Sequence, residues 1–406
     1  MKSPHGSRRE FMQSTGALIV GYSLGGASAA AAQSDGGLRG IDPANLDSWI
    51  AIASNGSVTI YTGRVDLGTG TEIVLAQFAA EELDVPVERV SVIMGDTRVT
   101  PDQGKTTASL NVIRGSQPIR IAAAEARAAL VRMAAQELGT SEAELEVSEG
   151  IVHPKGLPDD GISYGELIGD KNFSITLELA GTTAEDISRG VMLKENAPLK
   201  AVADYRIIGQ SVPRPDIPAK VAGTYTFVHN VRIPGMLHGR VVRPPSMGST
   251  LLSVSDDAIR EIPGARVVQR NNFLGVVAPR EEDAIKAARA VRAEWSEVEV
   301  LPEFDQIYDE LPNQPVVADV MSYDDGDIEA GLARGQHKLK ASYNFPFQEH
   351  AMIGPSCGIA DVRSDHATIW SGSQWPQGDR SDIATMLGLA LDDVQLIWHA
   401  GSGSYG

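Results

Sequence analysis

Short loops rich in glycine, threonine and serine recur along this chain, and loops of this composition are suited to binding phosphate groups. GTGT covers 68–71, GKTTAS covers 104–109, and GSGSYG covers 401–406. Glycine lets an anion approach backbone N–H groups, and the start of a following helix adds partial positive charge. One such loop is usually only a tight turn. Several in one chain together predict a site for a phosphate-bearing ligand.

The last of these loops has the Gly-x-Gly-x-x-Gly spacing of dinucleotide-binding folds, at Gly401, Gly403 and Gly406. A truncated enzyme of the nicotinamide or flavin class is therefore one hypothesis. The helix and the acidic residue that this motif requires would follow Gly406. A P-loop is excluded, because GKTT at 104–107 has Val99 in place of the first required glycine.

The densest polar cluster is formed by Gln348, Glu349 and His350, where an expected strand opens into a Gly-Pro turn. Such a triple can serve acid–base chemistry, and the alternative is a strand end that faces solvent. The histidines elsewhere lack the spacing of metal ligands, and Cys357 is the only cysteine. The side chains therefore predict neither a zinc site nor an iron–sulfur cluster.

The composition is that of a folded protein with several domains. The chain has 406 residues, of which 42% are hydrophobic and 22% charged, and this length predicts about two to four domains. The net charge of −18 argues against nucleic acid as a partner, because nucleic acid needs a basic surface.

Residues 1–32 have the pattern of a targeting segment. Arg8 and Arg9 precede a mildly apolar stretch at 17–24 and an alanine run that ends at Ala32. This order predicts a twin-arginine export signal and a periplasmic location. A membrane-anchoring helix is the alternative, but the stretch is too short and too rich in glycine and alanine to span a bilayer.

Local patterns predict a mixed α+β architecture. The Asn55-Gly56 pair predicts a hairpin over 48–62, helical spacing predicts helices over 72–85 and 119–138, and recurring prolines predict a linker over 198–218. The other expected elements are strands within 88–96, 144–152, 221–245, 337–347 and 394–400, and helices within 280–295 and 382–391.

Longer stretches resemble a known family. The 63–115 segment, which begins GRVDLGTGTE, resembles the cofactor-binding segment of large molybdopterin subunits in the xanthine dehydrogenase family. RPDIPAKVAGTYTFVHNVRIPGMLHGRVVRPP at 214–245 is similar to the start of that family's α/β hammerhead domain. FQEHAMIGPSCGIADV, SGSQWP and GSGSYG resemble its loops around the molybdenum centre. The order of these motifs over 45–406 resembles the periplasmic branch typified by isoquinoline 1-oxidoreductase and nicotinate dehydrogenase.

The resemblance implies an α+β fold in which molybdopterin-binding segments flank a hammerhead domain, preceded by the twin-arginine signal. The expected parts are the signal peptide at 1–32, an N-terminal molybdopterin-binding segment at 45–200, the hammerhead domain at 214–300, and the start of the main molybdopterin-binding domain at 330–406. The implied cofactor is a molybdopterin cytosine dinucleotide. Its molybdenum is bound by the pterin's sulfurs, so no metal ligand is expected from the protein.

The resemblance also implies roles for individual residues. Gln348 would lie beside the metal, and Glu349 is a further catalytic candidate. Thr69 stands where the family usually has glutamine. The residues implied to line the cofactor are Gly68, Thr69, Gly70, Thr71, Gly104, Thr106, Thr107, Ser109, Gln348, Gly401, Ser402, Gly403, Ser404, Tyr405 and Gly406.

The implied activity is hydroxylation of a small-molecule substrate, either an aromatic N-heterocycle or an aldehyde, with oxygen from water. A two-iron two-sulfur small subunit and a c-type cytochrome would accept the electrons. The family's catalytic glutamate base belongs to its C-terminal half, so this chain is expected to lack the base and to need that half as a partner. The alternative from another class is a non-catalytic remnant or binding module.

Overall fold

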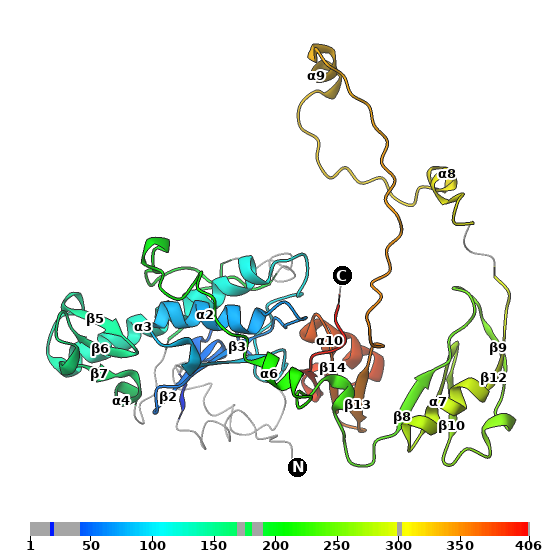
Figure 1. Cartoon of the computed structure of the whole chain (residues 1–406), viewed down its shortest axis with the longest axis horizontal. Helices are drawn as coiled ribbons and strands as arrows, with labels where there is room; N and C mark the ends of the chain where they lie inside the picture. The colour runs from blue at the N-terminus through cyan, green and yellow to red at the C-terminus, as the bar shows by residue number, and fades with distance from the viewer. Residues whose placement is uncertain (1–16, 20–40, 169–174, 181–189, 299–302, 405–406) are drawn as a thin grey trace. The chain divides into compact units, whose positions relative to one another are not determined.

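The computed structural model describes residues 17–19, 41–168, 175–180, 190–298 and 303–404 (Figure 1). The chain divides into two compact units, residues 1–231 with 350–406 and residues 232–349. Most of the predicted signal peptide lies outside the described residues. Its described part is β1, Ala17–Ile19, which pairs antiparallel with β2 of the first unit. No helix within the described ranges is long and apolar enough to cross a membrane.

The N-terminal sheet of the first unit has the strand order β1-β2-β3-β4. The predicted hairpin is confirmed: β2 (Ile50–Ala53) and β3 (Val58–Thr62) pair antiparallel across a turn in which Gly56 has a φ of 79°. The predicted strand within 88–96 is β4 (Val90–Met94), which pairs parallel with β3. A parallel pair needs a crossover connection, and α2 (Thr71–Leu83) supplies it.

The helices α2 and α3 pack against each other beside this sheet (Figure 1). The predicted alanine-rich helix is confirmed as α3 (Ser116–Leu138), which follows directly on a π-helical turn at Asn111–Gly115. The apolar face of α2 carries Leu75, Ala79 and Leu83, all fully buried. Burial of this face, together with the small alanines of α3 that allow close approach, builds the largest core of the chain.

A small sheet follows α3, with the strand order β5-β6-β7. The single strand predicted within 144–152 is wrong, because the chain turns back at Glu149 and Gly150, whose φ angles are 53° and 75°. Two left-handed residues in succession suit the tight turns that join antiparallel strands. The elements are β5 (Leu145–Ser148), β6 (Ile151–Pro154), β7 (Ile162–Ser163) and α4 (Tyr164–Ile168).

The proline-rich segment 198–215, called the strap below, is not a free linker. The buried Glu81 carboxylate at the end of α2 accepts the backbone amides of Arg206, Ile207 and Ile208 at 2.7–3.0 Å. The neighbouring Glu82 carboxylate accepts the amide of Lys200 at 3.1 Å. These charge-assisted bonds hold the strap along α2, up to the short helix α6 (Asp216–Val221).

The C-terminal segment of the first unit forms a sheet of order β13-β14-β15 with α10 as crossover between the parallel strands β14 and β15. Its elements are β13 (Gly358–Val362), β14 (Ala367–Ser371), α10 (Pro376–Leu387) and β15 (Val394–Trp398). The predicted final helix and strand are thereby confirmed. The Trp398 amide donates to Gly95 O at 3.1 Å, and the Thr97 amide donates to Leu396 O at 3.0 Å. The segment is therefore bonded directly to the residues after β4.

The second unit packs α7 against β8 and β11, with Ile259, Val276 and Ala287 in its core. The helix predicted within 280–295 is confirmed as α7, which ends before β12. The elements are β8 (His238–Val241), β9 (Leu251–Ser255), β10 (Arg266–Arg270), β11 (Phe273–Ala278), α7 (Glu281–Ala290), β12 (Arg292–Trp295), α8 (Ile307–Glu310) and α9 (Ile328–Arg334).

Two strand predictions fail around this unit. Of the strands expected over 221–245 only β8 forms, and residues up to Val231 belong to the first unit. Residues 337–347 form no strand, and Leu339, Tyr343 and Phe345 are 99%, 81% and 82% exposed. A strand needs hydrogen-bonding partners along its edge, and no described segment pairs with this one.

Candidate functional site

The GTGT loop is organised by Asp66. The Asp66 Oδ1 atom accepts the amides of Gly68 at 2.8 Å and Gly70 at 3.2 Å, and Oδ2 accepts the Glu72 amide at 3.4 Å. Gly68 and Gly70 have φ angles of 107° and 83°, a region in which side chains are strained. The expectation that these amides bind an anion is wrong in this detail, because the chain's own carboxylate already accepts them.

The hydroxyl groups of the GTGT loop remain to line a cavity. Thr69 Oγ1 lies 3.2 Å from Thr71 Oγ1, and Asn111 Nδ2 donates to Thr71 Oγ1 at 3.0 Å. A side-chain hydrogen bond thus joins the start of α2 to the π-helical turn that precedes α3. The Asn111 Oδ1 atom is buried and has no hydrogen-bond partner among the described residues. A buried acceptor without a donor is costly, so this atom suits a ligand that donates.

The GKTTAS loop contributes backbone donors at its C-terminal end. Gly104 donates to Asp102 Oδ1 at 2.9 Å, and Thr106 is buried, with its amide bonded to Gln374 O at 2.9 Å. Neither amide is available to a ligand.

The next three residues of this loop differ. Thr107, Ala108 and Ser109 are exposed, and the described chain supplies no acceptor for their amides. Ala108 and Ser109 adopt left-handed φ angles of 53° and 58°, just before the helical run that begins at Asn111. Free amides at the start of a long helix are a binding site for a phosphate.

Positive side chains lie at the same helix start. The Arg64 guanidinium is buried and its Nη1 donates to the Lys105 carbonyl. Burial lowers the pKa of Arg64, and the neighbouring charge of Arg114 lowers that pKa further. The nearby carboxylate of Asp102 raises the pKa of Arg64 and so offsets part of this repulsion.

The GSGSYG loop is described as far as Ser404, and the predicted site residues Tyr405 and Gly406 lie outside the described residues. Ser402 Oγ donates to Gly354 O at 2.7 Å, and Ser404 Oγ donates to Gln374 Oε1 at 2.6 Å. Among the residues that the structure describes, the amides of Gly401, Ser402 and Gly403 have no acceptor. This loop therefore also offers backbone donors.

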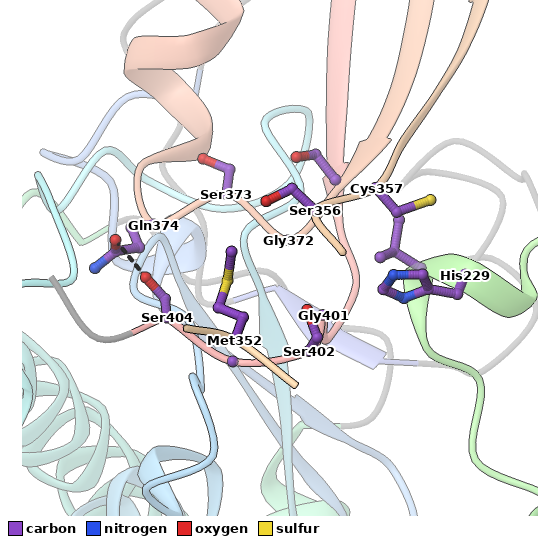
Figure 2. A pocket seen from close by; sticks show the side chains of 13 residues that line it. His229, Met352, Ser356, Cys357, Gly372, Ser373, Gln374, Gly401, Ser402 and Ser404 are labelled. Carbon is purple, nitrogen blue, oxygen red and sulfur yellow. Dashed lines mark hydrogen bonds between the residues drawn. The ribbon is translucent and has the colours of Figure 1, made fainter. Parts of the chain in front are cut away.

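The three predicted loops come together around adjoining cavities of the first unit. The loop cavity, of about 570 Å³, is lined by Thr69 and Thr71, by residues 106–112, and by Gln374 and Ser404. The serine cavity, of about 270 Å³, is lined by residues 401–404 and by Ser356, Cys357 and Gln374 among others (Figure 2). The lysine cavity, of about 220 Å³, lies between residues 66–68, residues 400–403 and Lys220.

Gln374 joins two of these cavities, because it lines both. Its Nε2 atom donates to Thr106 O at 2.8 Å. Its Oε1 atom accepts from Ser404, as Figure 2 shows. One side chain thereby bonds the GKTTAS loop to the GSGSYG loop, which lie almost 300 positions apart in the sequence. Sequence reasoning did not single out Gln374, although it lies in the quoted SGSQWP motif.

The other predicted residues are placed differently. Gln348 and Glu349 belong to the second unit, where both side chains are exposed, and their proposed roles stay predictions. Within the described ranges, no group of three or more histidine, cysteine, aspartate or glutamate side chains could hold a metal ion. Asp66 and Asn111 were missed by sequence reasoning. Asp66 could have been found from the D-x-G-x-G spacing, which is typical of an aspartate that accepts amides two and four residues on.

The first unit thus brings polar loops with free amides around adjoining cavities, and comparison with known proteins identifies the family. Residues 9–228 and 307–406 each match a family described as a molybdopterin cofactor-binding domain. The chain belongs to the molybdopterin cofactor-binding family, in the branch of the xanthine dehydrogenase-type large subunits.

Its relatives are longer proteins. A nicotinate dehydrogenase subunit of Pseudomonas putida is 36% identical over 98% of this chain and 33% of that protein. The beta subunit of isoquinoline 1-oxidoreductase from Brevundimonas diminuta is 27% identical over 98% of this chain and 56% of that protein. A solved aldehyde oxidoreductase of Desulfovibrio gigas overlaps 51% of this chain and 28% of its own, at 19% identity and a TM-score of 0.40. The chain spans a third to just over half of the two curated relatives.

The residues of the site fit a molybdopterin-type group. The amides of 107–109 and 401–403 can donate to phosphate and pterin oxygens, and the buried Asn111 Oδ1 can accept from an amino group. The loop cavity offers space for such a group, and the serine cavity, which shares Gln374 and Ser404 with it, adjoins that space.

Proposed function

We propose that the first unit binds molybdopterin in its cytosine dinucleotide form, and that the chain is the molybdopterin-binding part of a molybdenum-dependent oxidoreductase. The observation that carries this proposal is the meeting of three separate polar loops around cavities that share Gln374 and Ser404. A dinucleotide with a pterin at one end is longer than any one of these loops, so several of them are needed to bind it.

The dinucleotide phosphates would bind at the amides of Thr107, Ala108 and Ser109, with the dipole of the helical run from Asn111 behind them. The pterin would lie between Asn111 Oδ1 and the amides of Gly401–Gly403. When bound, the cofactor supplies a two-electron oxidation in which water provides the oxygen. The residues of this chain bind and orient it. The GTGT loop, whose amides are bound by Asp66, fixes where the Thr69 and Thr71 hydroxyls lie.

The substrate in this proposal is an aromatic N-heterocycle or an aldehyde. Nicotinate and isoquinoline appear in the names of the two relatives reported above, and both are N-heterocycles. The serine cavity brings Val228 and Met352 together with several serine hydroxyls, a lining that accepts a flat apolar ring with one polar edge.

Partners and location extend the proposal. The relatives are named as subunits, and we propose a two-iron two-sulfur protein and a c-type cytochrome as electron acceptors. Residues 1–32 would direct export to the periplasm. Replacing Arg8 and Arg9 with lysine should then keep the protein in the cytoplasm, and equal periplasmic amounts of variant and wild type would contradict export by this route.

A pair of matched variants tests the cofactor proposal. Ala108→Glu places a carboxylate at the free amides, whereas Ala143→Glu makes the same change at another exposed position, in the turn before β5. The full chain, produced in a host that makes the cofactor, is assayed for molybdenum and for cytosine nucleotide released by acid. We expect both in the wild type and the Ala143→Glu variant, and about tenfold less in Ala108→Glu, the effect of roughly 1.4 kcal/mol of charge repulsion. No molybdenum in the wild type would overturn the proposal.

A further inference from the structure

The RPDIPAK motif has a use that neither its place near the hammerhead segment nor the family match assigns. Arg214 lies near the end of the strap, and its Nε and Nη2 atoms donate to the two carboxylate oxygens of Asp216 at 2.9 and 2.6 Å. Lys220 Nζ donates to the same carboxylate at 2.5 Å from one turn further along α6. These three residues, called the Arg214 clasp, all belong to the first unit.

The clasp reaches the GTGT loop through one hydrogen bond. The remaining Arg214 nitrogen, Nη1, donates to Gly68 O at 2.9 Å. The aliphatic part of the same side chain covers the loop, since a Cβ atom added to Gly70 would lie 3.5 Å from Arg214 Cδ. A guanidinium can make these bonds together because its donors are fixed in one plane, with a carboxylate on one edge and a carbonyl on the other.

The loop is thus held by two side chains. Asp66 accepts the amides of Gly68 and Gly70, and Arg214 donates to the Gly68 carbonyl. Gly68 and Gly70 have the widest backbone freedom of any residue type, so without these restraints the turn that carries Thr69 would sample several conformations. The direction of the Gly68 carbonyl fixes the peptide plane that precedes Thr69.

We propose that Arg214 is a positioning residue, which orders residues 66–72 so that the Thr69 and Thr71 hydroxyls face the loop cavity. The purpose of the ordered loop rests on the proposed function. The ordering itself can be tested without it. The clasp also faces a second loop across a cavity, because Lys220 and residues 400–403 both line the lysine cavity. Asp216 accepts hydrogen bonds from both other residues of the clasp. The bonds from Arg214, and then from Lys220, keep the pKa of its carboxyl group well below its usual range despite partial burial.

A structural role alone would predict a different result from a positioning role. The Asp216 side chain is only 8% exposed, but Lys220 still donates to its carboxylate when Arg214 is replaced. No buried charge is then left unpaired, so global stability should change less than the stability of the loop. Its effect should be confined to the loop. Local opening of one loop is visible as faster amide hydrogen exchange in that loop while the rest of the unit keeps its protection.

The experiment measures hydrogen exchange by mass spectrometry on the full chain and on three variants. Arg214→Gln removes the guanidinium group, and Arg214→Lys keeps the positive charge. Arg260→Gln is a matched control whose exposed ion pairs lie in the second unit. In Arg214→Gln we expect exchange in the 66–72 peptide to rise about tenfold, the loss of one charge-assisted hydrogen bond, with β5 and β6 unchanged. Arg214→Lys should recover part of this protection, and the control should match the wild type.

Two results would overturn the proposal. One is unchanged exchange of the 66–72 peptide in Arg214→Gln, and the other is an equal rise throughout the first unit, which would mean a general loss of stability. Molybdenum content is measured in the same samples. Wild-type protein without molybdenum would refute the proposed function and leave the exchange result standing, whereas slow exchange in every variant would refute the positioning role whether or not molybdenum is bound.

Discussion

Replacing Gln374 with methionine gives the sharpest prediction about how the site is assembled. The side chain of Gln374 donates to the Thr106 carbonyl at 2.8 Å and accepts from the Ser404 hydroxyl at 2.6 Å. Methionine has nearly the same length and can make neither bond. The backbone bond from the Thr106 amide to Gln374 O is independent of the side chain and should persist.

The size of the effect follows from the surroundings of the two partners. Thr106 is 5% exposed, so its carbonyl would lose its donor in a buried place, which costs about 1–3 kcal/mol. The Ser404 hydroxyl is half-buried and can turn to water, which limits its loss to about 0.5–1 kcal/mol. We expect the free energy of unfolding of the first unit to fall by about 2–3 kcal/mol.

Gln377→Met is the matched control, because Gln377 makes one side-chain hydrogen bond to the Thr100 carbonyl at 3.1 Å. Thr100 is 1% exposed, so its carbonyl also loses a donor in a buried place, which costs about 1–3 kcal/mol, but no bond to a second loop is lost. Urea unfolding followed by tryptophan fluorescence compares the variants, since Trp375 is next to Gln374 and two residues from Gln377. Equal losses for the two variants, with unchanged molybdenum content in Gln374→Met, would refute the idea that Gln374 joins the two loops.

Two further predictions concern carboxylates of α2. Glu81→Gln should lower the free energy of unfolding by about 2–4 kcal/mol, because the buried carboxylate accepts three amides of the strap. Thermal unfolding measures this loss. The control Glu178→Gln, whose ion pair is exposed, should show almost no change. The pKa of Glu72 is raised by burial and then by the nearby charge of Asp216, so the native state holds this proton more tightly than the unfolded state and stability is lost as pH rises above the ordinary value of 4.5. Glu72→Gln should therefore be more stable than wild type at pH 7 and equal to it at pH 4, and a Glu72→Gln variant less stable than wild type at pH 7 would contradict this sign.

The sequence predicts the elements whose determinants are local. The Asn55-Gly56 turn specifies the β2–β3 hairpin without help from the rest of the chain. Helical spacing gives α2 and α3 for the same reason, since neighbours three and four positions apart share one face. By contrast, residues 337–347 alternate as a strand does, but a strand exists only where another strand pairs with it.

The site is predicted in part. The composition of the loops identifies the segments that line the cavities, because glycine, serine and threonine leave the backbone accessible. Which amides are free depends on side chains that compete for them. Asp66 takes the amides of Gly68 and Gly70, while nothing in the described chain takes those of Thr107 and Ser109. Which amides are taken and which are free is set by contacts in the folded chain, so the composition of the loops does not predict it.

The strap shows the same limit on a larger scale. Its prolines predict a linker between modules, yet the carboxylates of Glu81 and Glu82 bind its backbone over several residues. Both glutamates belong to the helical pattern of α2, where acidic residues normally face solvent. Only their burial at 0% exposure reveals that they hold another segment.

The central claim is that the polar loops of the first unit bind a molybdopterin cofactor. Anomalous X-ray scattering at the molybdenum K edge, recorded from crystals of the full chain purified with its cofactor, locates the metal directly. We predict one strong peak in the first unit, beside residues 401–404 and the serine cavity. A peak elsewhere on the chain, or molybdenum-free crystals from protein made in a cofactor-producing host, would contradict the claim.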